Sequence, residues 1–289
     1  MRFIKAIIFL LLSIILLPTA VSAQTGLKVL SYNVLYGLQN DSVTKQSYVE
    51  WVKQKDPDIV AYQEMNDFTQ KGLEAFAAQY GHPYAVLSKT DGFPVALTSK
   101  YPIVNTQKVV DNMWHAYIYA NVNGNHVFVI HFSPFSYQKR RHEVAEVLAR
   151  AALIPQEEPI MIMGDFNSLS ADDADAYDEA FVESRREAER QREIVRNLDN
   201  GKLDYSVTDA MKKAGFQDAI RLFHQDFQRS APTQKYFKGT MQRIDYLWVN
   251  DVLAQRIRSA DFIYDDVTDT ISDHYPLFVT FDTASPPTR

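Results

Sequence analysis

Short apolar runs, each bounded by Gly, Pro, Asn, Asp or another polar residue, recur along most of the chain. Runs of this length with turn residues at both ends predict β-strands rather than long helices. We expect strands at 27–35, 58–64, 84–87, 93–98, 104–110, 114–121, 125–131, 160–163, 243–249, 257–264 and 277–281. Asn123-Gly124 lies between two of these runs and predicts a tight hairpin, so at least one pair of strands is antiparallel. A purely parallel, doubly wound sheet is therefore ruled out.

Helices are expected where apolar residues return every three to four positions. Ser42 can cap a helix over 42–55, and a second helix over 69–80 ends at Gly81. Further helices are expected at 137–154 and 208–214. Strands that alternate with helices, together with the hairpin, indicate an α/β (α+β) fold with mixed sheets.

The first 23 residues have the plan of a secretory signal peptide. Arg2 and Lys5 precede an apolar run over 7–17, and Val21-Ser22-Ala23 supplies a small-x-small cleavage site. An uncleaved anchor is the alternative, although the apolar run is shorter than the roughly 20 residues that a spanning helix needs. We expect a signal peptide over 1–23, one mature domain over 24–289, and a secreted or periplasmic protein.

Charge and cysteine content narrow the picture. The chain has no Cys, so it can form no disulfide, and its stability must come from its core. It has 30 basic and 36 acidic residues, and the mature chain without Arg2 and Lys5 is near −8. No basic run marks a nucleic-acid groove, which argues against tight binding of long nucleic acid but not against an enzyme that meets phosphate through a metal.

Two charged segments allow two interpretations each. The segment 171–200 is rich in Asp, Glu and Arg and predicts one long or two short outer helices with a turn at Asn200-Gly201: either a solvated insertion or a lid beside a pocket. Lys139, Arg140 and Arg141 lie in the first turn of the helix predicted at 137–154, where the macrodipole disfavours them. They form either a solvated face or a set of anion contacts near a site.

Six predicted strands each deliver a polar side chain at or near one end. These side chains are Asn33, Glu64, His131, Asp165 with Asn167, Asp245, and Asp273 with His274. Each one alone can be explained structurally, as a strand end, a surface turn or a backbone-bonded side chain. Six independent structural explanations are improbable together, so we expect a shared site.

Alternation places some of these residues on particular faces. The apolar run 160–163 ends at Gly164, and if the strand continues through Phe166, Asp165 and Asn167 share one face; the alternative is an Asx-type turn. In the strand 243–249, Asp245 shares a face with apolar residues, so its carboxylate needs a donor or a positive partner.

The residue types in this set point to metal-assisted chemistry. Carboxylate and amide oxygens suit Mg²⁺, with Mn²⁺ or Ca²⁺ also possible, rather than structural zinc. Imidazoles with carboxylates beside them suit proton transfer and stabilisation of developing charge. A hard divalent ion, water and imidazoles together describe hydrolysis of a phosphate ester.

The order of these motifs resembles the endonuclease/exonuclease/phosphatase superfamily, the deoxyribonuclease I-like phosphoesterases. The matching elements, spread from about Leu27 to Phe281, are Ser31-Tyr32-Asn33-Val34, Gln63-Glu64, His131-Phe132-Ser133, Gly164-Asp165-Phe166-Asn167, Arg243-Ile244-Asp245-Tyr246 and Ser272-Asp273-His274. The resemblance implies a four-layer αββα sandwich, in which two mixed sheets lie face to face between helices. We therefore expect that fold and a secreted bacterial-type member.

The resemblance also implies a role for each oxygen donor. Glu64 resembles the principal metal ligand, assisted by Asn33 and Asp273. Asp165 and Asn167 resemble the pair that orients the attacking water and the phosphate.

Roles for the imidazoles follow in the same way. His274 resembles the imidazole that touches the scissile phosphate as base or charge stabiliser, with Asp273 beside it. His131 matches a second imidazole, with Asp245 as its expected orienting partner. Family members differ on whether an Asp or a His is the base, so that assignment stays open.

Departures from the family bear on the substrate. The DNA-gripping basic loops of abasic-site endonucleases and the disulfides of pancreatic-type deoxyribonucleases are absent from the sequence. This favours a monomeric phosphoesterase acting on a small or lipid-linked phosphate mono- or diester. The alternatives are a secreted non-specific endonuclease and a non-catalytic binding module, whose signature would be loss of one of the site residues.

Overall fold

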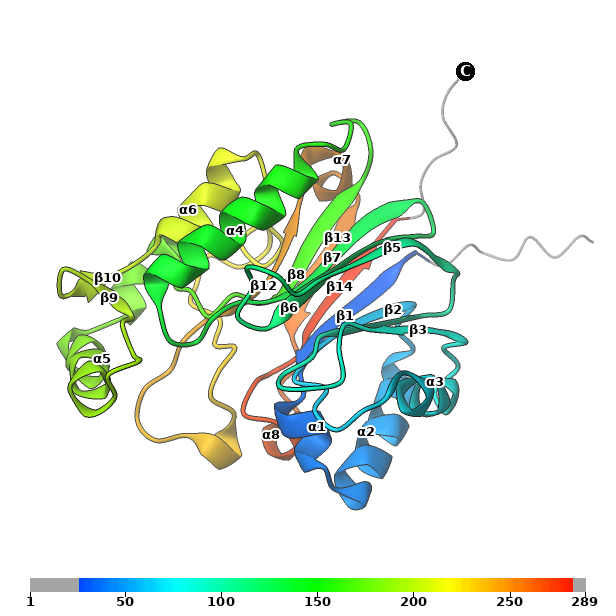
Figure 1. Cartoon of the computed structure of the whole chain (residues 1–289), viewed down its shortest axis with the longest axis horizontal. Coiled ribbons are helices and arrows are strands. Elements are labelled where there is room, and N and C mark those ends of the chain that lie inside the picture. The colour runs from blue at the N-terminus through cyan, green and yellow to red at the C-terminus, as the bar shows by residue number, and fades with distance from the viewer. Residues whose placement is uncertain (1–25, 283–289) are drawn as a thin grey trace, which may run out of the picture.

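The computed structural model describes residues 26–282, and the predicted signal peptide lies outside this range. Two six-stranded sheets lie face to face between two layers of helices (Figure 1). The predicted αββα sandwich of two mixed sheets is therefore confirmed. No helix in the described part is long and apolar enough to cross a membrane.

The first sheet has the strand order β13-β14-β1-β2-β4-β3. β1 and β2 are parallel, and the other pairs are antiparallel. In sheet order, its strands are β13 (Ile257–Phe262), β14 (Leu277–Phe281), β1 (Lys28–Asn33), β2 (Ile59–Gln63), β4 (Ala96–Ser99) and β3 (Tyr84–Leu87).

The second sheet has the order β11-β12-β8-β7-β6-β5, and only β7 and β8 are parallel. In sheet order, its strands are β11 (Gln217–Asp218), β12 (Asp245–Val249), β8 (Ile160–Asp165), β7 (Asn125–His131), β6 (Ala116–Val122) and β5 (Ile103–Val109). Asn123-Gly124 forms the tight turn between β6 and β7, as predicted.

Helices cover the outer faces of both sheets. α2 (Ser42–Lys55) and α3 (Gln70–Ala78) pack on the first sheet, and α4 (Tyr137–Ala151) and α6 (Ser206–Lys213) pack on the second. The short helices are α1 (Leu35–Gln39), η1 (Ala171–Ala176), η2 (Gln234–Tyr236), α7 (Asp251–Ala254) and α8 (Thr268–Ile271). Asp41, not Ser42, caps α2: its carboxylate accepts the Thr44 N–H at 2.7 Å, because Ser42 is already the first helical residue.

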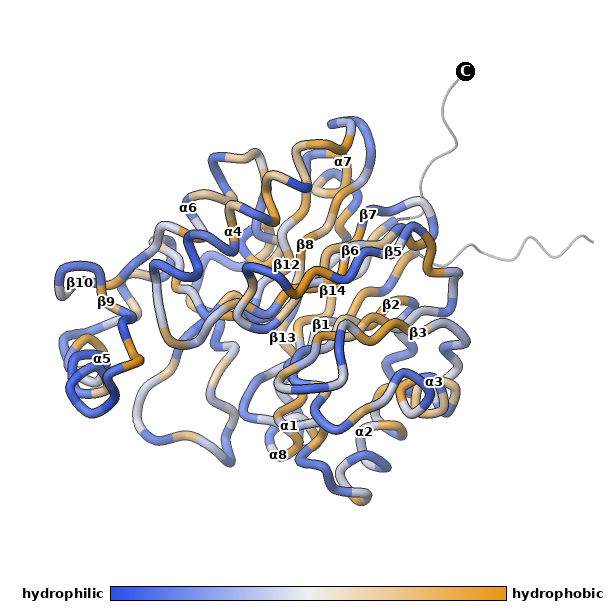
Figure 2. Tube along the Cα trace, viewed as in Figure 1, coloured by the Kyte–Doolittle hydropathy of each residue, from blue (hydrophilic) through white to orange (hydrophobic). Residues whose placement is uncertain are grey.

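Alternation along the strands divides the apolar side chains among three layers of core. Leu247 and Val249 of β12 point between the sheets, whereas Tyr246 and Trp248 point outward beneath the helices. Figure 2 shows the strands as the most hydrophobic part of the trace and α5 (Glu179–Gln191) as mostly hydrophilic. The fold is therefore held by burial on both faces of each sheet.

The charged segment 171–200 folds outside the sandwich. It contains η1, α5 and strand β9 (Leu198–Asp199), which turns at Asn200-Gly201 into β10 (Lys202–Leu203). The prediction of two short helices and a turn at Asn200-Gly201 is confirmed. Phe181 is the buried anchor of α5, which packs on a small separate cluster with Tyr177 and Ile244.

The first strand is shorter than predicted. β1 ends at Asn33, and residues 35–40 follow in left-handed backbone conformation, with φ between 47° and 63°. The prediction extended this strand to residue 35 because Val34 and Leu35 are apolar. The chain turns instead, and the N–H of Gly37 bonds to the Glu64 carbonyl at 2.6 Å.

Candidate active site

All eight predicted site residues lie at one edge of the sandwich, where strands of both sheets end. In the second sheet, His131, Asp165 and Asp245 are direct neighbours across β7, β8 and β12. In the first sheet, Asn33 pairs with Gln63, and Glu64 follows at once. Parallel strands bring their carboxyl ends to one edge, which explains why residues far apart in sequence meet here.

Asn33 connects the two sheets. Its Nδ2 donates to Oε1 of Glu64 at 3.3 Å and to Oδ2 of Asp165 at 3.1 Å. Its Oδ1 accepts the Leu35 N–H at 3.2 Å. Asn33 thus reaches the two carboxylates as a donor, whereas the expected role of metal ligand needs its oxygen.

Glu64 lies on the first-sheet side of the site. It follows β2 in left-handed conformation (φ 62°), and its Oε2 accepts the Tyr36 N–H at 3.1 Å. Burial raises the pKa of the Glu64 carboxyl, and the Tyr36 bond only partly opposes that rise. The left-handed turn after β1 therefore holds a carboxylate in surroundings that disfavour its charge.

Asp165 lies at the centre of the network and is only 2% exposed. Its Oδ1 accepts the Asn167 N–H at 2.8 Å, an Asx-type contact, and the Asn167 side chain bonds to the Phe132 carbonyl at 3.1 Å. Burial and the nearby Asp245 carboxylate raise the pKa of Asp165 to about 8. The turn interpretation of this segment is confirmed and the strand interpretation is wrong, because β8 ends at Asp165 and Asn167 turns with φ 48°.

Asp245 bonds to His274 and not to His131, which corrects the expected pairing. Nδ1 of His274 lies 2.7 Å from Oδ2 of Asp245. β8 lies between β12 and β7, so Asp165 separates Asp245 from His131. Strand order, which the sequence does not specify, decides the pairing.

Charge on the two imidazoles differs. Burial opposes the charged form of His274, but Asp245 and Asp273 outweigh it and raise its pKa well above 6.5. Its Nε2 lies 3.9 Å from Oδ2 of Asp165 and 4.0 Å from Oδ1 of Asp273. Burial, His115 and His274 lower the pKa of His131 well below 6.5. His274 is therefore an imidazolium at neutral pH and His131 a neutral imidazole.

His131 lacks the expected carboxylate partner. Its Nε2 is 3.5 Å from Oδ2 of Asp165, and its buried Nδ1 has no hydrogen-bond partner among the described residues. Its ring stacks on His115, with centroids 4.1 Å apart. The ring centroid of His115 lies 5.1 Å from that of Phe93, and the Phe93 centroid lies 5.5 Å from that of Tyr36. A row of aromatic rings therefore runs from the centre of the site to exposed Tyr36.

Several supporting residues were not predicted. Oγ of Ser272 donates to the Asn33 carbonyl at 2.7 Å and accepts the His274 N–H at 3.2 Å, and Oγ of Ser230 accepts the Asp245 N–H at 3.2 Å. Ser272 belongs to the Ser-Asp-His motif, which could have indicated it. His115 and Ser230 carry no local signal, because only the tertiary fold brings them to the site.

The donor set fits a hard divalent cation. Glu64, Asp165, Asp245 and Asp273 gather around His274, so negative charge is in excess; after burial, the Asp245 charge is the main cause of the raised pKa of Asp165. Ligand atoms of Asp165, Asp245 and His274 lie within 4.8 Å of one another. That trio differs from the predicted ligands Glu64, Asn33 and Asp273. Because Nδ1 of His274 already bonds to Oδ2 of Asp245, we favour Glu64 over Asp245 as the principal metal ligand.

Comparison with known proteins agrees with this geometry. The sequence model of the endonuclease/exonuclease/phosphatase family matches residues 30–274. The chain belongs to this family, and is thus among the hydrolases that act on phosphate ester bonds. No curated protein matches its sequence.

Solved structures share the fold at low sequence identity. A 3′ phosphatase (NExo) from Neisseria bound to a product DNA hairpin has a TM-score of 0.66 and 20% identity, over 89% of this chain and 100% of that chain. An AP endonuclease from Archaeoglobus fulgidus has a TM-score of 0.64 and 21% identity, with the same coverage. TDP2 from D. rerio complexed with a single-strand DNA product has a TM-score of 0.61 and 15% identity, over 89% of this chain and 99% of that chain.

Proposed function

We propose that the protein is a secreted or periplasmic metal-dependent phosphoesterase. It hydrolyses a phosphate mono- or diester by attack of water, assisted by a metal and by Asp and His side chains. One observation carries the proposal: Asn33, Glu64, Asp165 and the His274–Asp245 pair form one buried network where the two sheets meet.

Each side chain has a task in this proposal. His274, kept cationic by Asp245, faces the phosphate with Nε2 and stabilises its developing negative charge. Asp165 and Asn167 orient the attacking water and a phosphate oxygen. Burial lowers the pKa of His131, which makes it a weak proton acceptor that contacts the phosphate as an uncharged group; Asp165, whose pKa is raised, is the better candidate for the base.

Mg²⁺ is the proposed cofactor, with Mn²⁺ or Ca²⁺ as alternatives. Glu64 and Asp273 would hold it, with Asp165 close by, since hard carboxylate oxygens are the ligands that these ions prefer. When bound, the ion would offset the excess carboxylate charge and polarise the phosphate.

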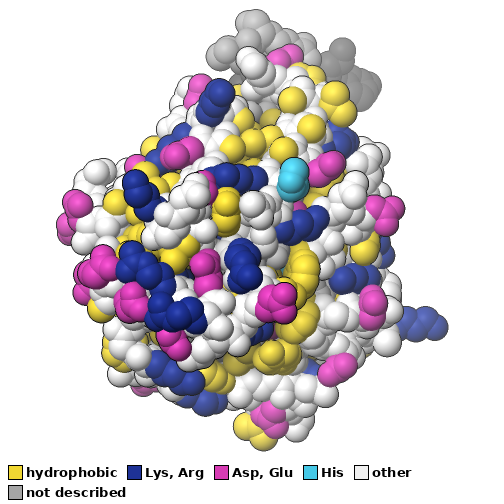
Figure 3. Space-filling model, turned by 60° about the vertical axis from the view of Figure 1, so that its left-hand side comes forward, with side chains coloured by type: hydrophobic (Ala, Val, Ile, Leu, Met, Phe, Trp, Pro, Cys, Tyr) yellow, Lys and Arg dark blue, Asp and Glu magenta, His cyan; other side chains and the backbone are white. Residues whose placement is uncertain are grey.

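A small or lipid-linked phosphate is the favoured substrate, acted on by a monomer. On the face in Figure 3, basic and acidic side chains are interleaved, and no single-sign stripe runs across it. Such a surface, on a chain of net charge −6, does not steer a long polyanion. A secreted nuclease is the second candidate, because the solved structures that share this fold include proteins in complex with DNA.

An activity panel tests the proposal. The protein, with Mg²⁺ or Mn²⁺, is given bis-p-nitrophenyl phosphate, plasmid DNA, RNA, sphingomyelin, and phosphorylated sugars and inositols. We expect metal-dependent hydrolysis that His274→Ala abolishes and His224→Ala retains, since His224 pairs with Asp261 away from the site. Absence of metal-dependent hydrolysis across the panel would refute the proposal.

Export is tested separately. We expect cleavage after Ala23 when the full chain is expressed in a bacterial host with a Sec pathway, detected as the N-terminus of the exported protein by mass spectrometry. An intact Met1 terminus on a cell-associated protein would contradict it.

A further inference from the structure

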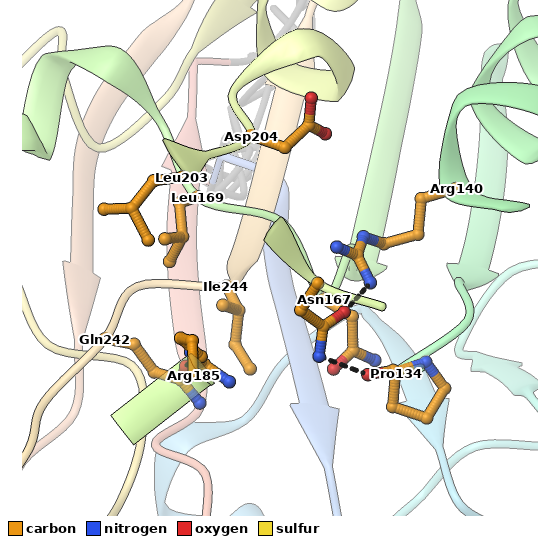
Figure 4. Close-up of a pocket in the computed structure, with 10 residues that line it drawn as sticks. Pro134, Arg140, Asn167, Leu169, Arg185, Leu203, Asp204, Gln242 and Ile244 are labelled. Carbon is orange, nitrogen blue, oxygen red and sulfur yellow. Dashed lines mark hydrogen bonds between the residues drawn. The ribbon is translucent and has the colours of Figure 1, made fainter. Parts of the chain in front are cut away.

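A small pocket opens beside the catalytic network. Its cavity volume is about 40 Å³, and its lining residues include Asn167, Arg140, Arg185, Asn197 and Gln242 (Figure 4). Asn167 belongs both to this pocket and to the Asp165 network. Of the eight predicted site residues, Asn167 is the one that lines this pocket, so Asn167 is where the pocket adjoins the catalytic network.

Two arginines reach this pocket from different elements. Arg140 comes from the first turn of α4 and Arg185 from α5 of the charged segment, and Figure 4 shows their guanidinium groups on opposite sides. Arg140 is only 3% exposed. Burial lowers the pKa of both groups, that of Arg140 to about 10; the nearby Asp204 carboxylate opposes the fall at Arg140, and the charge of Arg185 adds to it. Two guanidinium groups thus share one confined space.

Neither arginine has a carboxylate partner. Within residues 26–282, Nη1 of Arg140 donates to the Ser133 carbonyl at 3.0 Å and to Oδ1 of Asn197 at 2.8 Å, and its buried Nε has no acceptor. In the same range, Arg185 donates only to Oε1 of Gln242. Buried charges are normally paired, because an unpaired buried charge costs several kcal/mol.

Arg243 is a buried arginine with a structural role, and it serves as a comparison for Arg140 and Arg185. It is fully buried and bonds to the carboxylates of Asp173, at 2.7 Å, and Asp218. Asp204, the acidic residue that lines the pocket, bonds to Arg141 at 2.6 Å, and in Figure 4 its carboxylate points away from Arg140. Arg140 and Arg185 have no such carboxylate bond; Arg185 lies over the Phe181 ring at 4.8 Å, and no carboxylate neutralises its charge by direct contact among the described residues.

We propose that Arg140, Arg185 and Asn197 form a subsite for a second phosphate group of the substrate. This inference rests on the proposed phosphoesterase function and narrows it to substrates that carry two phosphates. Guanidinium groups bind phosphate through paired, charge-assisted hydrogen bonds. Neither arginine makes such a bond to an anionic group of the described part of the protein, so both are available to a phosphate. In this proposal, the segment 171–200 is an insertion that helps to bind the substrate. Arg140 then makes an anion contact, which is the second of the two interpretations given for residues 139–141.

Matched substrates that differ by one phosphate test the subsite. The first pair is thymidine 5′-(p-nitrophenyl phosphate) with and without a 3′-phosphate, and the second is fructose 1,6-bisphosphate and fructose 6-phosphate. With Mg²⁺, we expect kcat/KM to be at least about tenfold higher for the doubly phosphorylated member of one pair. Whichever pair shows the preference indicates whether the substrate is a nucleotide or a sugar phosphate.

Variants then assign the preference to the pocket. Arg185→Gln should reduce the ratio to near one, through KM, and Arg185→Lys should retain part of it. Arg190→Gln, on the same helix but paired with Glu183 and Glu187 at the surface, should keep the wild-type ratio. Equal ratios in the wild type and Arg185→Gln would overturn the subsite.

Direct binding separates this inference from the proposed function. Inorganic phosphate is titrated calorimetrically into the metal-free protein in EDTA. We expect binding that Arg185→Gln weakens by about tenfold and Arg190→Gln leaves intact. If the wild-type protein binds phosphate through Arg185 but hydrolyses no substrate, only the phosphoesterase proposal is refuted. Turnover without such binding, and with no substrate preference, would refute only the subsite.

Discussion

Asp245→Asn tests the central pair of the site with little change of shape. Asn is nearly isosteric with Asp, and the hydrogen bond of 2.7 Å to Nδ1 of His274 can be replaced by a neutral one. The substitution removes the charge that most favours the imidazolium of His274. It also removes the charge that, after burial, most raises the pKa of Asp165.

The size of the effect follows from the type of bond. A hydrogen bond to a charged group contributes roughly 1.5–3 kcal/mol. Since 1.36 kcal/mol corresponds to a factor of ten in an equilibrium constant, loss of this charge should favour the neutral imidazole about ten- to a hundredfold, and the pKa of His274 should fall. The pKa of Asp165 should fall from about 8 toward its ordinary range.

The sign is the same for both groups. In the proposed mechanism, activity needs Asp165 without its proton and His274 with its proton, so the acidic limb of the pH profile would report Asp165 and the alkaline limb His274. Both limbs should move to lower pH in Asp245→Asn. We expect the loss of kcat/KM on bis-p-nitrophenyl phosphate to be larger at pH 9 than at pH 6, measured with Mg²⁺ or Mn²⁺ across the range.

A surface pair supplies the matched control. Asp261 lies 2.9 Å from Nε2 of His224 and is exposed, so Asp261→Asn should leave the pH profile unchanged. NMR titration of the His274 ring in the metal-free protein measures the pKa directly and does not depend on activity. If the His274 resonance titrates at the same pH in both proteins, or the rate falls equally at every pH, the reasoning about this pair is wrong.

Three further predictions concern metal, backbone and stability. Glu64→Gln should weaken Mn²⁺ binding, measured by electron paramagnetic resonance, by at least about tenfold because one ligand charge is lost; unchanged binding would move the metal to other carboxylates. Gly164→Ala should destabilise the fold by about 2 kcal/mol or more in urea unfolding, because a Cβ there would lie 2.0 Å from the Ile130 carbonyl oxygen, whereas Gly201→Ala meets no atom within 4 Å and should cost less. Burial lowers the pKa of His82 to about 4, so the unfolded chain takes up this proton first as the pH falls from 6.5 and about 3 kcal/mol of stability is lost by pH 4. His82→Gln should flatten that dependence, and an equally steep loss in the variant would assign it to other groups.

The sequence by itself determined the strands, the mixed character of the sheets and the residues of the site. Alternation, turn residues and the Asn-Gly hairpin are local signals, because each depends on a few adjacent residues. Polar side chains at strand ends are also readable locally, so Asp165 and His274 could be selected before any strand was placed.

Tertiary structure decided how those residues are paired. The order β12-β8-β7 gives Asp245 to His274 and leaves His131 beside Asp165 and His115. Only the folded chain shows that Asn33 is a donor and that buried Arg140 and half-buried Arg185 face a pocket next to Asn167. These contacts join segments tens to hundreds of residues apart, and long-range pairing leaves no periodic trace in a single sequence because it depends on strand order and burial.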